Sequence, residues 1–330
     1  MKTIYPPKIG SGAHIRVIAP ARSLGLISPE NIGVAKALFD QIGLQLSFGR
    51  HVHEKDEFNS SSVESRITDL HEAFADKSVN GILSVIGGYN SGQLLGHIDY
   101  RLIAANPKTL CGFSDITTLS NAIYAKTGLV GYSGPHFSSF GMKKGFEYTL
   151  DSFRQCLFDA EPYTLVPSKE WSDDPWFSDQ EYRTFTRNEG HCVINKVEGA
   201  FEGTIVGGHL GSFALLQGTP YWPSLKNSIV MVEEVETTKP EIWDQRLQSL
   251  LHQEEADQIQ AVLIGRIPPN AGISIEMLSK IIKSKDILGK IPVIANVDFG
   301  HTTPIATYPI GGHCRVCISG RESEICIVKH

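Results

Sequence analysis

Short apolar runs alternate with helix-like segments along the first third of the chain. The runs at 14–19, 44–48 and 81–86 are predicted strands. Between them, 28–43 and 61–74 carry apolar side chains at helical spacing, and the first of these opens with a capping serine followed by proline. Such alternation predicts a parallel sheet covered by helices, in which ligands bind beyond the carboxyl ends of the strands.

One stretch joins a predicted strand to a predicted helix through a serine. The strand ends at Gly112, Ser114 follows, and apolar positions recur at helical spacing from Ile116. Such a turn places a hydroxyl at a helix N-terminus, where free N–H groups favour developing negative charge. Ser114 is therefore a candidate nucleophile, and the alternative is that it merely caps the helix. Gly87 and Gly88 close a strand at the same sheet edge, which favours the catalytic interpretation.

The second half of the chain again alternates apolar runs with helical periodicity. Helices are predicted at 240–252 and 273–284, and a β-hairpin at 314–328. Gly207 and Gly208 are expected to form a turn. The predicted strands of this half are 203–210, 228–235, 261–266 and 291–295.

Residues 169–187 separate the two halves and lack both helical and strand periodicity. Their aromatic side chains argue against disorder, so they are predicted to form a long ordered loop. We divide the chain into an N-terminal domain (1–165), a linker with an aromatic loop (166–198) and a C-terminal domain (199–330). The predicted class is α/β: an N-terminal flavodoxin- or Rossmann-like parallel-sheet domain, then a mixed α/β domain, with an active site in the interdomain cleft.

Two further strand ends carry side chains that a serine nucleophile needs. Acyl transfer by serine requires a base and a carboxylate that orients it. His301 follows a glycine after the last predicted strand of the second half, and Glu233 and Glu234 close another strand. Adjacent strand residues point to opposite faces, so only one glutamate can reach a shared site. A structural histidine and a solvated strand end are the alternatives, and spacing does not choose between the glutamates.

The composition is that of an ordinary globular protein, with 41% hydrophobic and 20% charged residues and a net charge of −6. The absence of a basic block excludes non-specific nucleic-acid binding as the main task. No apolar run reaches the roughly 18 residues of a membrane span, and no secretion signal opens the chain. Six scattered cysteines fit reduced thiols, so a cytoplasmic location is expected.

Other motifs give weaker indications. His51 and His53 are a possible metal pair without an evident third ligand, and a surface pair is the simpler interpretation. Cys314 and Cys317 have redox-motif spacing but lie in a strand pattern, so we interpret them as packing residues. Neither a P-loop nor a full dinucleotide fingerprint is present, which argues against a nicotinamide enzyme.

Taken together, seven short motifs resemble the LD-carboxypeptidase family of serine peptidases, and in particular its branch of microcin C self-immunity proteins (MccF). The resemblance covers nearly the whole chain, and its specificity comes from the order of the motifs. They lie at 87–91, 106–108, 112–117, 134–135, 207–208, 232–234 and 298–302.

The resemblance implies a Ser–Glu–His triad formed by Ser114, Glu233 and His301, with the first glutamate of the pair as the catalytic one. It also implies an oxyanion hole built from the backbone N–H groups of Gly88 and Asp115. No metal or other cofactor is expected, and the assembly that the resemblance suggests is a homodimer.

The aromatic loop resembles that of the MccF branch. Trp171 or Trp176 could stack on a nucleobase, or could instead form a hydrophobic clasp between domains. Tyr89 and His209 are further candidate substrate contacts, although His209 stands where the resemblance implies asparagine.

The expected activity is hydrolysis of the amide-type bond between the C-terminal amino acid and the nucleotide of microcin C-like peptidyl or aminoacyl nucleotides. One alternative is release of the terminal D-alanine of murein tetrapeptide. An alternative of another class is non-catalytic binding of a small ligand, for which no Ser/Glu/His set is needed.

Overall fold

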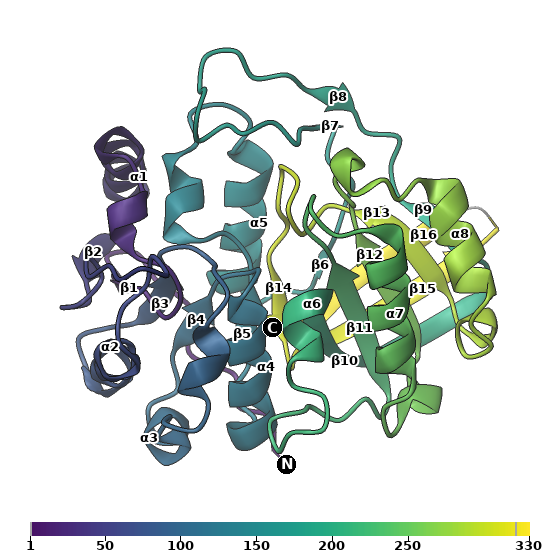
Figure 1. Ribbon diagram of the computed structural model, residues 1–330, viewed down its shortest axis with the longest axis horizontal. Helices are drawn as coiled ribbons and strands as arrows, with labels where there is room; N and C mark the ends of the chain where they lie inside the picture. The colour runs from purple at the N-terminus through teal and green to yellow at the C-terminus, as the bar shows by residue number, and fades with distance from the viewer. Residues whose placement is uncertain (1, 321) are drawn as a thin grey trace.

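Two lobes lie side by side, each built on one large sheet (Figure 1). The computed structural model describes residues 2–320 and 322–330. The first sheet has the strand order β14-β5-β4-β3-β1-β2, and β14 is its antiparallel strand. Its other strands are β1 (His14–Ile18), β2 (Gln45–Phe48), β3 (Gly81–Ser84), β4 (Thr109–Cys111) and β5 (Gly131–Ser133). Its helices are α1 (Pro29–Gln41), α2 (Val63–Ala75), α3 (Tyr100–Ala105), α4 (Ile116–Thr127) and α5 (Glu147–Leu157).

The parallel sheet is confirmed, and its strands follow the flavodoxin-like order 2-1-3-4-5, which the sequence left open between flavodoxin-like and Rossmann-like folds. In this order the chain leaves β1 and β3 toward opposite sides of the sheet, which opens a crevice at their carboxyl ends. Local signals place the helices: Ser28 Oγ accepts from the Asn31 N–H at the start of α1, and Ser62 Oγ accepts from the Ser65 N–H at the start of α2.

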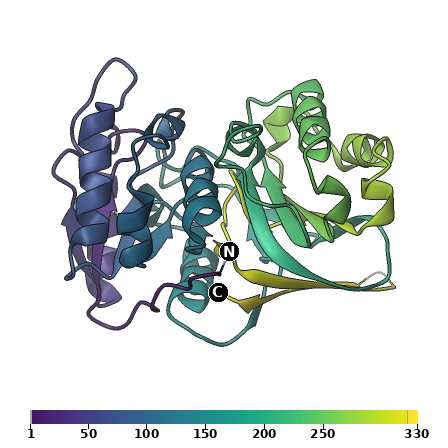
Figure 2. The same ribbon diagram turned by 90° about the horizontal axis from the view of Figure 1, so that it is seen from below.

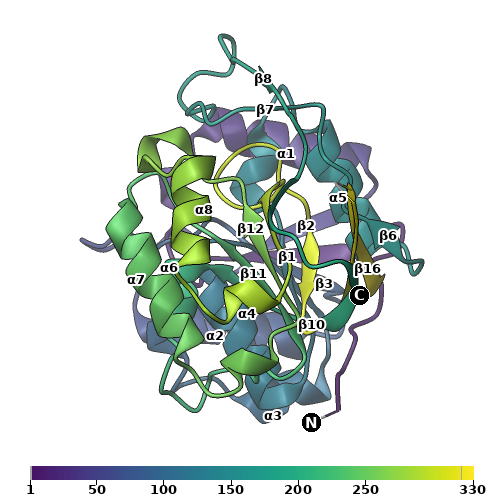
Figure 3. The same ribbon diagram turned by 90° about the vertical axis from the view of Figure 1, so that its right-hand side faces the viewer.

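The second sheet has the order β6-β16-β15-β10-β11-β12-β13-β9. Its parallel centre consists of β10 (Gly199–His209), β11 (Ser228–Glu233), β12 (Ala261–Gly265) and β13 (Val293–Val297). The antiparallel strands are β6 (Tyr163–Thr164), β9 (Cys192–Asn195), β15 (His313–Ser319) and β16 (Glu322–Lys329). Helices α7 (Pro240–Leu251) and α8 (Ile275–Lys283) lie on the same side of this sheet, with the short α6 (Leu210–Ala214) beside them (Figure 3).

The chain passes between the two sheets more than once. β6 and β9 precede the predicted C-terminal domain in sequence but lie in the second sheet, whereas β14 (Tyr308–Ile310) returns from the second lobe to pair with β5. The boundaries at 165 and 198 stay a prediction.

Two buried apolar clusters each contain side chains from both lobes. The two lobes lie side by side in Figure 2. Ile205 of β10 belongs to the cluster that contains Phe39 and Phe137 of the first lobe. The next residue, Val206, belongs to the cluster that contains Leu119 of α4. Because adjacent strand residues face opposite ways, both faces of β10 are anchored in a core that also holds the first lobe. Groups contributed by different lobes are therefore held in a fixed relation.

One local prediction is wrong and another is incomplete. Gly207 and Gly208 do not form a turn but lie inside β10, with φ of 112° and 129°. Side chains there would collide with Met231 and Thr117, so the glycines permit close approach of neighbouring segments. The loop at 169–187 contains a short hairpin, β7 (Glu170–Trp171) with β8 (Thr186–Arg187), which lies over the top of both lobes in Figure 1.

Candidate active site

Ser114 lies on a strained turn between β4 and α4. Its φ is 60°, in the left-handed region that non-glycine residues rarely adopt. The N-cap position of α4 belongs to Asp115, so the alternative that Ser114 is the capping residue is wrong. The turn presents the Ser114 hydroxyl at the carboxyl edge of the first sheet and directly before the N-terminus of α4.

Two glycines let the loop after β3 approach the Ser114 turn and the segment after β1. A Cβ on Gly87 would lie 2.9 Å from Ser114 Cβ and 3.0 Å from Ser114 Oγ. A Cβ on Gly88 would lie 3.0 Å from both Ala21 Cβ and Arg22 Cγ. All of these distances are shorter than ordinary van der Waals contacts, so a larger residue at Gly87 would push the loop away from Ser114, and one at Gly88 would push it away from the segment after β1.

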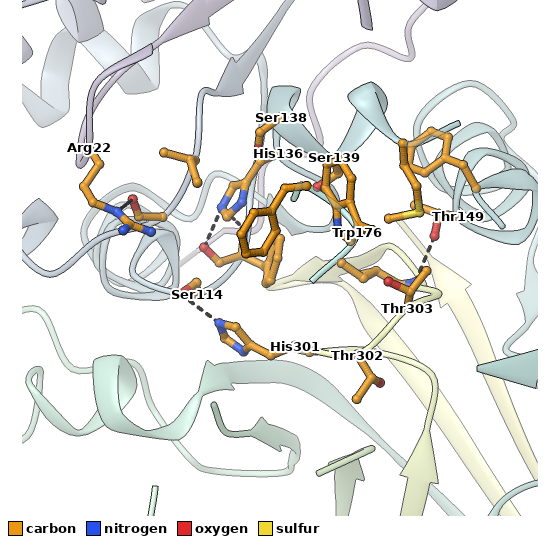
Figure 4. A pocket seen from close by; sticks show the side chains of 18 residues that line it. Arg22, Ser114, His136, Ser138, Ser139, Thr149, Trp176, His301, Thr302 and Thr303 are labelled. Atoms are coloured by element: carbon orange, nitrogen blue, oxygen red, sulfur yellow. Dashed lines mark hydrogen bonds between the residues drawn. The ribbon is translucent and has the colours of Figure 1, made fainter. Parts of the chain in front are cut away.

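His301 and Glu233 form a hydrogen-bonded chain with Ser114. His301 Nε2 lies 3.0 Å from Ser114 Oγ, and His301 Nδ1 lies 2.6 Å from Glu233 Oε2 (Figure 4 shows the serine and the histidine). With the Nδ1 proton donated to the carboxylate, Nε2 is free to accept the serine proton. The chain joins the turn after β4 to the ends of β11 and β13, so it crosses from one lobe to the other.

The packing around this chain leaves little freedom for its members. Gly300 has φ of 106°, and a Cβ there would lie 2.8 Å from Glu233 Oε2. The Phe113 ring contacts His301 edge-on, with ring centroids 5.2 Å apart. Glu233 is buried and the His301 side chain is 16% exposed, so the imidazole is sheltered but reachable from the cleft.

Glu234 points to the opposite side of the strand, as the alternation predicts. Its carboxylate contacts His209 Nε2 at 3.0 Å, Thr238 Oγ1 at 2.7 Å and Arg246 Nη1 at 2.7 Å. Burial alone would raise the pKa of Glu234, but these donors outweigh it and lower that pKa to about 2. Burial lowers the pKa of His209, yet its hydrogen bond to Glu234 and the nearby Glu233 charge give a net rise. Glu234 is thus a charged anchor for His209 and Arg246.

Gly88 and Asp115 line the same cavity as Ser114, and no described residue accepts a hydrogen bond from either of their backbone N–H groups. The Asp115 side chain ties the two segments together: its Oδ2 accepts from the Ser91 N–H at 2.9 Å, and Ser91 Oγ donates to the Asp115 carbonyl at 2.8 Å. Burial raises the pKa of the Asp115 carboxyl. The side chains of Asp115 and Ser91 therefore fix the loop after β3 against the nucleophile turn.

Two residues near Ser114 were not identified as candidate site residues from the sequence. The fully buried His136 stacks on Phe113 with ring centroids 4.1 Å apart, and its Nε2 lies 2.9 Å from the Phe113 carbonyl. Burial lowers the pKa of His136 to about 3, so it supports the turn as a neutral ring. Arg22 follows β1, and its Nε donates to the Gly87 carbonyl at 3.1 Å. Two sequence signals could have indicated these residues: His136 directly follows the motif at 134–135, and Arg22 follows the first predicted strand.

The two loop tryptophans occupy different places. Trp176 lines a cavity of about 210 Å³ together with Ser114 and His301 (Figure 4). Trp171 lines a separate cavity and lies under the Arg266 guanidinium, 5.0 Å from the ring centroid. Ser172 exchanges two backbone hydrogen bonds with Thr303, at 2.8 and 2.7 Å, which fixes the loop beside the strand end that carries the histidine.

Tyr89 and His209 line a second, more polar cavity that also contains Ser114, Asp115 and His301. Three of the four predicted substrate contacts, Trp176, Tyr89 and His209, therefore line cavities that also contain Ser114. Trp171 lines neither of these two cavities. In residues 2–320 and 322–330, no cluster of three His, Cys, Asp or Glu side chains is placed to hold a metal.

The remaining motif residues have structural surroundings. His51 Nδ1 lies 2.8 Å from Asp69 Oδ1, and the residues around His53 form a turn rather than a strand. Cys314 and Cys317 lie on β15, as predicted, and all six cysteines are free. No helix in the described part of the chain is long and apolar enough to cross a membrane.

The comparisons with known proteins cover both lobes. Residues 15–134 match the model of the LD-carboxypeptidase N-terminal domain, and residues 202–316 match that of the LD-carboxypeptidase C-terminal domain. The putative carboxypeptidase YocD of Bacillus subtilis (strain 168) is 46% identical over 327 residues, which cover 99% of this chain and 100% of that relative. The chain belongs to the LD-carboxypeptidase family. The resemblance stated from the sequence is confirmed.

Within the LD-carboxypeptidase family, relatives of the MccF type are also similar. The microcin C7 self-immunity protein MccF of Escherichia coli is 30% identical, over 82% of this chain and 80% of that protein. A crystal structure of an MccF-like protein from Bacillus anthracis str. Ames matches with a TM-score of 0.97 and 47% identity, covering 99% of this chain and all of that one. The two-lobed α/β fold is confirmed, and the protein is a hydrolase of the carboxypeptidase type.

Proposed function

We propose that this LD-carboxypeptidase relative cleaves an amide-type bond through a triad of Ser114, His301 and Glu233. Ser114 Oγ attacks the scissile carbonyl carbon while His301 Nε2 takes the hydroxyl proton. Glu233 holds the imidazole in the required tautomer and stabilises the imidazolium that forms. The observation that supports this is the unbroken chain of 3.0 and 2.6 Å contacts between side chains from different lobes.

The oxyanion of the tetrahedral intermediate accepts hydrogen bonds from the Gly88 and Asp115 N–H groups, helped by the N-terminus of α4. The intermediate collapses when His301 gives its proton to the leaving nitrogen; the C–N bond breaks, the leaving group departs with that proton, and an ester is left on Ser114. Water then loses a proton to His301 and attacks the acyl carbon. The acid is released, and the proton returns to Ser114 Oγ.

As substrate we propose a microcin C-like peptidyl or aminoacyl nucleotide, cut between the amino acid and the nucleotide. The supporting observation is Trp176, an aromatic side chain in the cavity that contains both Ser114 and His301. Stacking of one base on such a side chain contributes about 1–3 kcal/mol. The alternative substrate is murein tetrapeptide, cleaved before its terminal D-alanine, and the LD-carboxypeptidase family description supports it.

A side-by-side assay separates these substrates. The purified protein is incubated with aspartyl-sulfamoyl-adenosine and with murein tetrapeptide, and the released amino acid or nucleotide is quantified by chromatography. The proposal predicts the larger kcat/KM for the nucleotide conjugate. A larger value for the tetrapeptide would assign the protein to peptidoglycan turnover instead.

Changing the two tryptophans one at a time tests the stacking role. Trp176→Ala is expected to lower kcat/KM for aspartyl-sulfamoyl-adenosine by about tenfold, since one base-stacking contact is lost. Trp171→Ala is the matched control, expected to change that value by less than about threefold, because Trp171 packs against Arg266 outside the cavity of Ser114. An equal loss from Trp176→Ala on the nucleotide conjugate and on a peptide without an aromatic group would contradict base stacking.

We also propose that the protein acts in the cytoplasm as a homodimer. The six free cysteines support a reducing compartment, and the resemblance to the family supports the dimer. Light scattering coupled to size-exclusion chromatography tests the assembly, with a mass of one chain as the contradicting result.

A further inference from the structure

A third cavity, of about 450 Å³, lies beside the cleft and has no part in the mechanism above. Its walls come from the segment after β1, the loop before α2 and the loop after β3. This is the crevice between the carboxyl ends of β1 and β3, where the chain leaves the sheet toward opposite sides. Open parallel sheets bind their ligands in such crevices. We call it the β1–β3 pocket; Arg22, Asp56, Phe58, Ser62, Arg66 and Tyr89 are among its lining residues.

The β1–β3 pocket has a surplus of positive charge. Arg22 and Arg66 both line it, and in the described part of the chain no carboxylate lies within ion-pair distance of either guanidinium. Arg66 is only 3% exposed, and its guanidinium donates to the carbonyls of Ser62, Pro20 and Asn90 and to Gln93 Oε1, at 3.4, 3.3, 3.0 and 2.6 Å, so it contributes charge to the pocket from a fixed position. Asp56 is the pocket's carboxylate, and its Oδ1 is already occupied by two backbone N–H groups of its own turn. The pocket is therefore lined by two cationic side chains and one carboxylate, and that carboxylate is already hydrogen-bonded.

Two aromatic side chains flank the opening of the β1–β3 pocket. Phe58 is 72% exposed and Tyr89 is 86% exposed. Phe58 is not on a loose segment, since its own N–H donates to Asp56 Oδ1 and Ser60 Oγ donates to the Ala21 carbonyl at 2.6 Å. The Arg22 guanidinium lies 5.8 Å from the Tyr89 ring centroid. Large apolar side chains that stay exposed to solvent at the opening of a cationic pocket are typical of a ligand-recognition site.

The pocket is continuous with the catalytic cleft. Arg22 and Tyr89 line both the β1–β3 pocket and the polar cavity that contains Ser114, and Arg22 also lines the cavity of Trp176. A carboxypeptidase-type hydrolase removes the C-terminal group of its substrate, so any longer portion of that substrate belongs to the acyl side. That portion must leave the cleft through an opening beside Ser114, and the β1–β3 pocket is adjacent to it.

We propose that the β1–β3 pocket is a subsite for a carboxylate on the acyl peptide, upstream of the residue whose carbonyl Ser114 attacks. Arg22 and Arg66 supply the charge, the start of α2 adds its dipole, and Phe58 and Tyr89 cover the peptide stem. The inference rests on the proposed function, because it needs Ser114 as the point of attack. It assigns to the enzyme a preference for acidic acyl peptides.

Two peptidyl-sulfamoyl-adenosine substrates test this preference. They are identical except for the two residues upstream of the aminoacyl group, which are both Glu in one and both Gln in the other. Wild-type protein is expected to give a kcat/KM about tenfold higher for the Glu substrate, the effect of one hydrogen bond to a charged group. Higher ionic strength is expected to reduce this ratio, because the interaction is between charges near the surface.

A negative charge introduced into the wall of the β1–β3 pocket tests whether the substrate carboxylate binds there. Ser62 caps α2 and lines the pocket, and both Asp and Asn are good capping residues. Ser62→Asp is therefore expected to fold normally, by melting temperature, and to lower the Glu-to-Gln ratio below about threefold through repulsion. Ser62→Asn, which has the same shape without the charge, should keep the wild-type ratio.

The outcomes separate the subsite from the reaction. Hydrolysis of both substrates at equal kcat/KM by wild-type protein would overturn the subsite and leave the triad standing. A preference for Glu that survives Ser62→Asp would move the carboxylate site elsewhere. Absence of hydrolysis of either substrate would contradict the proposed function and the subsite together.

Discussion

Ser114→Ala is expected to lower kcat by about a thousandfold or more, on whichever substrate the wild-type protein cleaves. The reason is that no other group in the cavity combines a hydroxyl with a hydrogen bond to His301 Nε2. Losses of this size follow removal of a triad member, because the remaining donors stabilise the oxyanion but form no acyl enzyme. Steady-state assays of matched preparations provide the measurement, and retained turnover would remove the proposed nucleophile.

Ser138→Ala is the control for this variant. Ser138 lines the same cavity and is buried, but it makes no hydrogen bond to His301. Both variants should melt within a few degrees of the wild type, because each loses one hydroxyl and creates no large void. Only Ser114→Ala should lose activity.

The second large effect distinguishes the adjacent glutamates. Glu233→Gln is expected to lower kcat by about 10³- to 10⁴-fold, because an amide can donate to His301 Nδ1 and hold the imidazole in the wrong tautomer. Glu234→Gln should lower kcat by less than about tenfold, since Glu234 contacts His209 and Arg246 rather than His301. The reverse ranking of kcat values would reassign the triad carboxylate.

Glu234→Gln should instead reduce stability, in a way that depends on pH. The pKa of Glu234 is lowered from 4.5 to about 2 in the folded protein, so its ionised form stabilises the fold. This contribution is complete above the unfolded pKa of 4.5 and is lost as the pH falls toward 2. The difference in unfolding free energy between wild type and Glu234→Gln should therefore shrink as the pH falls from 4.5 to 2. It should also fall as the pH rises from 6.5 through the raised pKa of His209, because the hydrogen bond to Glu234 contributes to that raised pKa; urea titration measures both changes. A difference that does not change with pH would contradict the assigned ionisation.

Sequence patterns predicted the local structure correctly where the whole pattern lay within one strand, turn or helix. Strand, turn and helix around Ser114 follow from periodicity and a glycine, and β4 and α4 confirm them. The hairpin of β7 and β8 has two residues in each strand, too few to produce an alternation. Gly207 and Gly208 suggested a turn because paired glycines occur both in turns and where a strand packs closely on its neighbours. In the structure they serve the second purpose, in β10.

The site could not be assembled from local signals alone. His301 lies 187 residues beyond Ser114, and it reaches the serine only because both lobes share their buried cores. Spacing left Glu233 and Glu234 equivalent, and their partners on opposite faces of β11 distinguish them. The resemblance to the family selected the three residues that the fold brings together. Arg22 was missed because its role depends on the loop after β3, which no pattern in its own segment reveals.

The most direct test of the central claim is reaction with a fluorophosphonate probe, followed by peptide mass spectrometry. One adduct per chain is expected, on the peptide that carries Ser114, and His301→Ala should slow its formation by at least about a hundredfold because the serine loses its base. Folded protein that gives no adduct, or an adduct on a different residue, would contradict the account of Ser114 as a nucleophile activated across the two lobes.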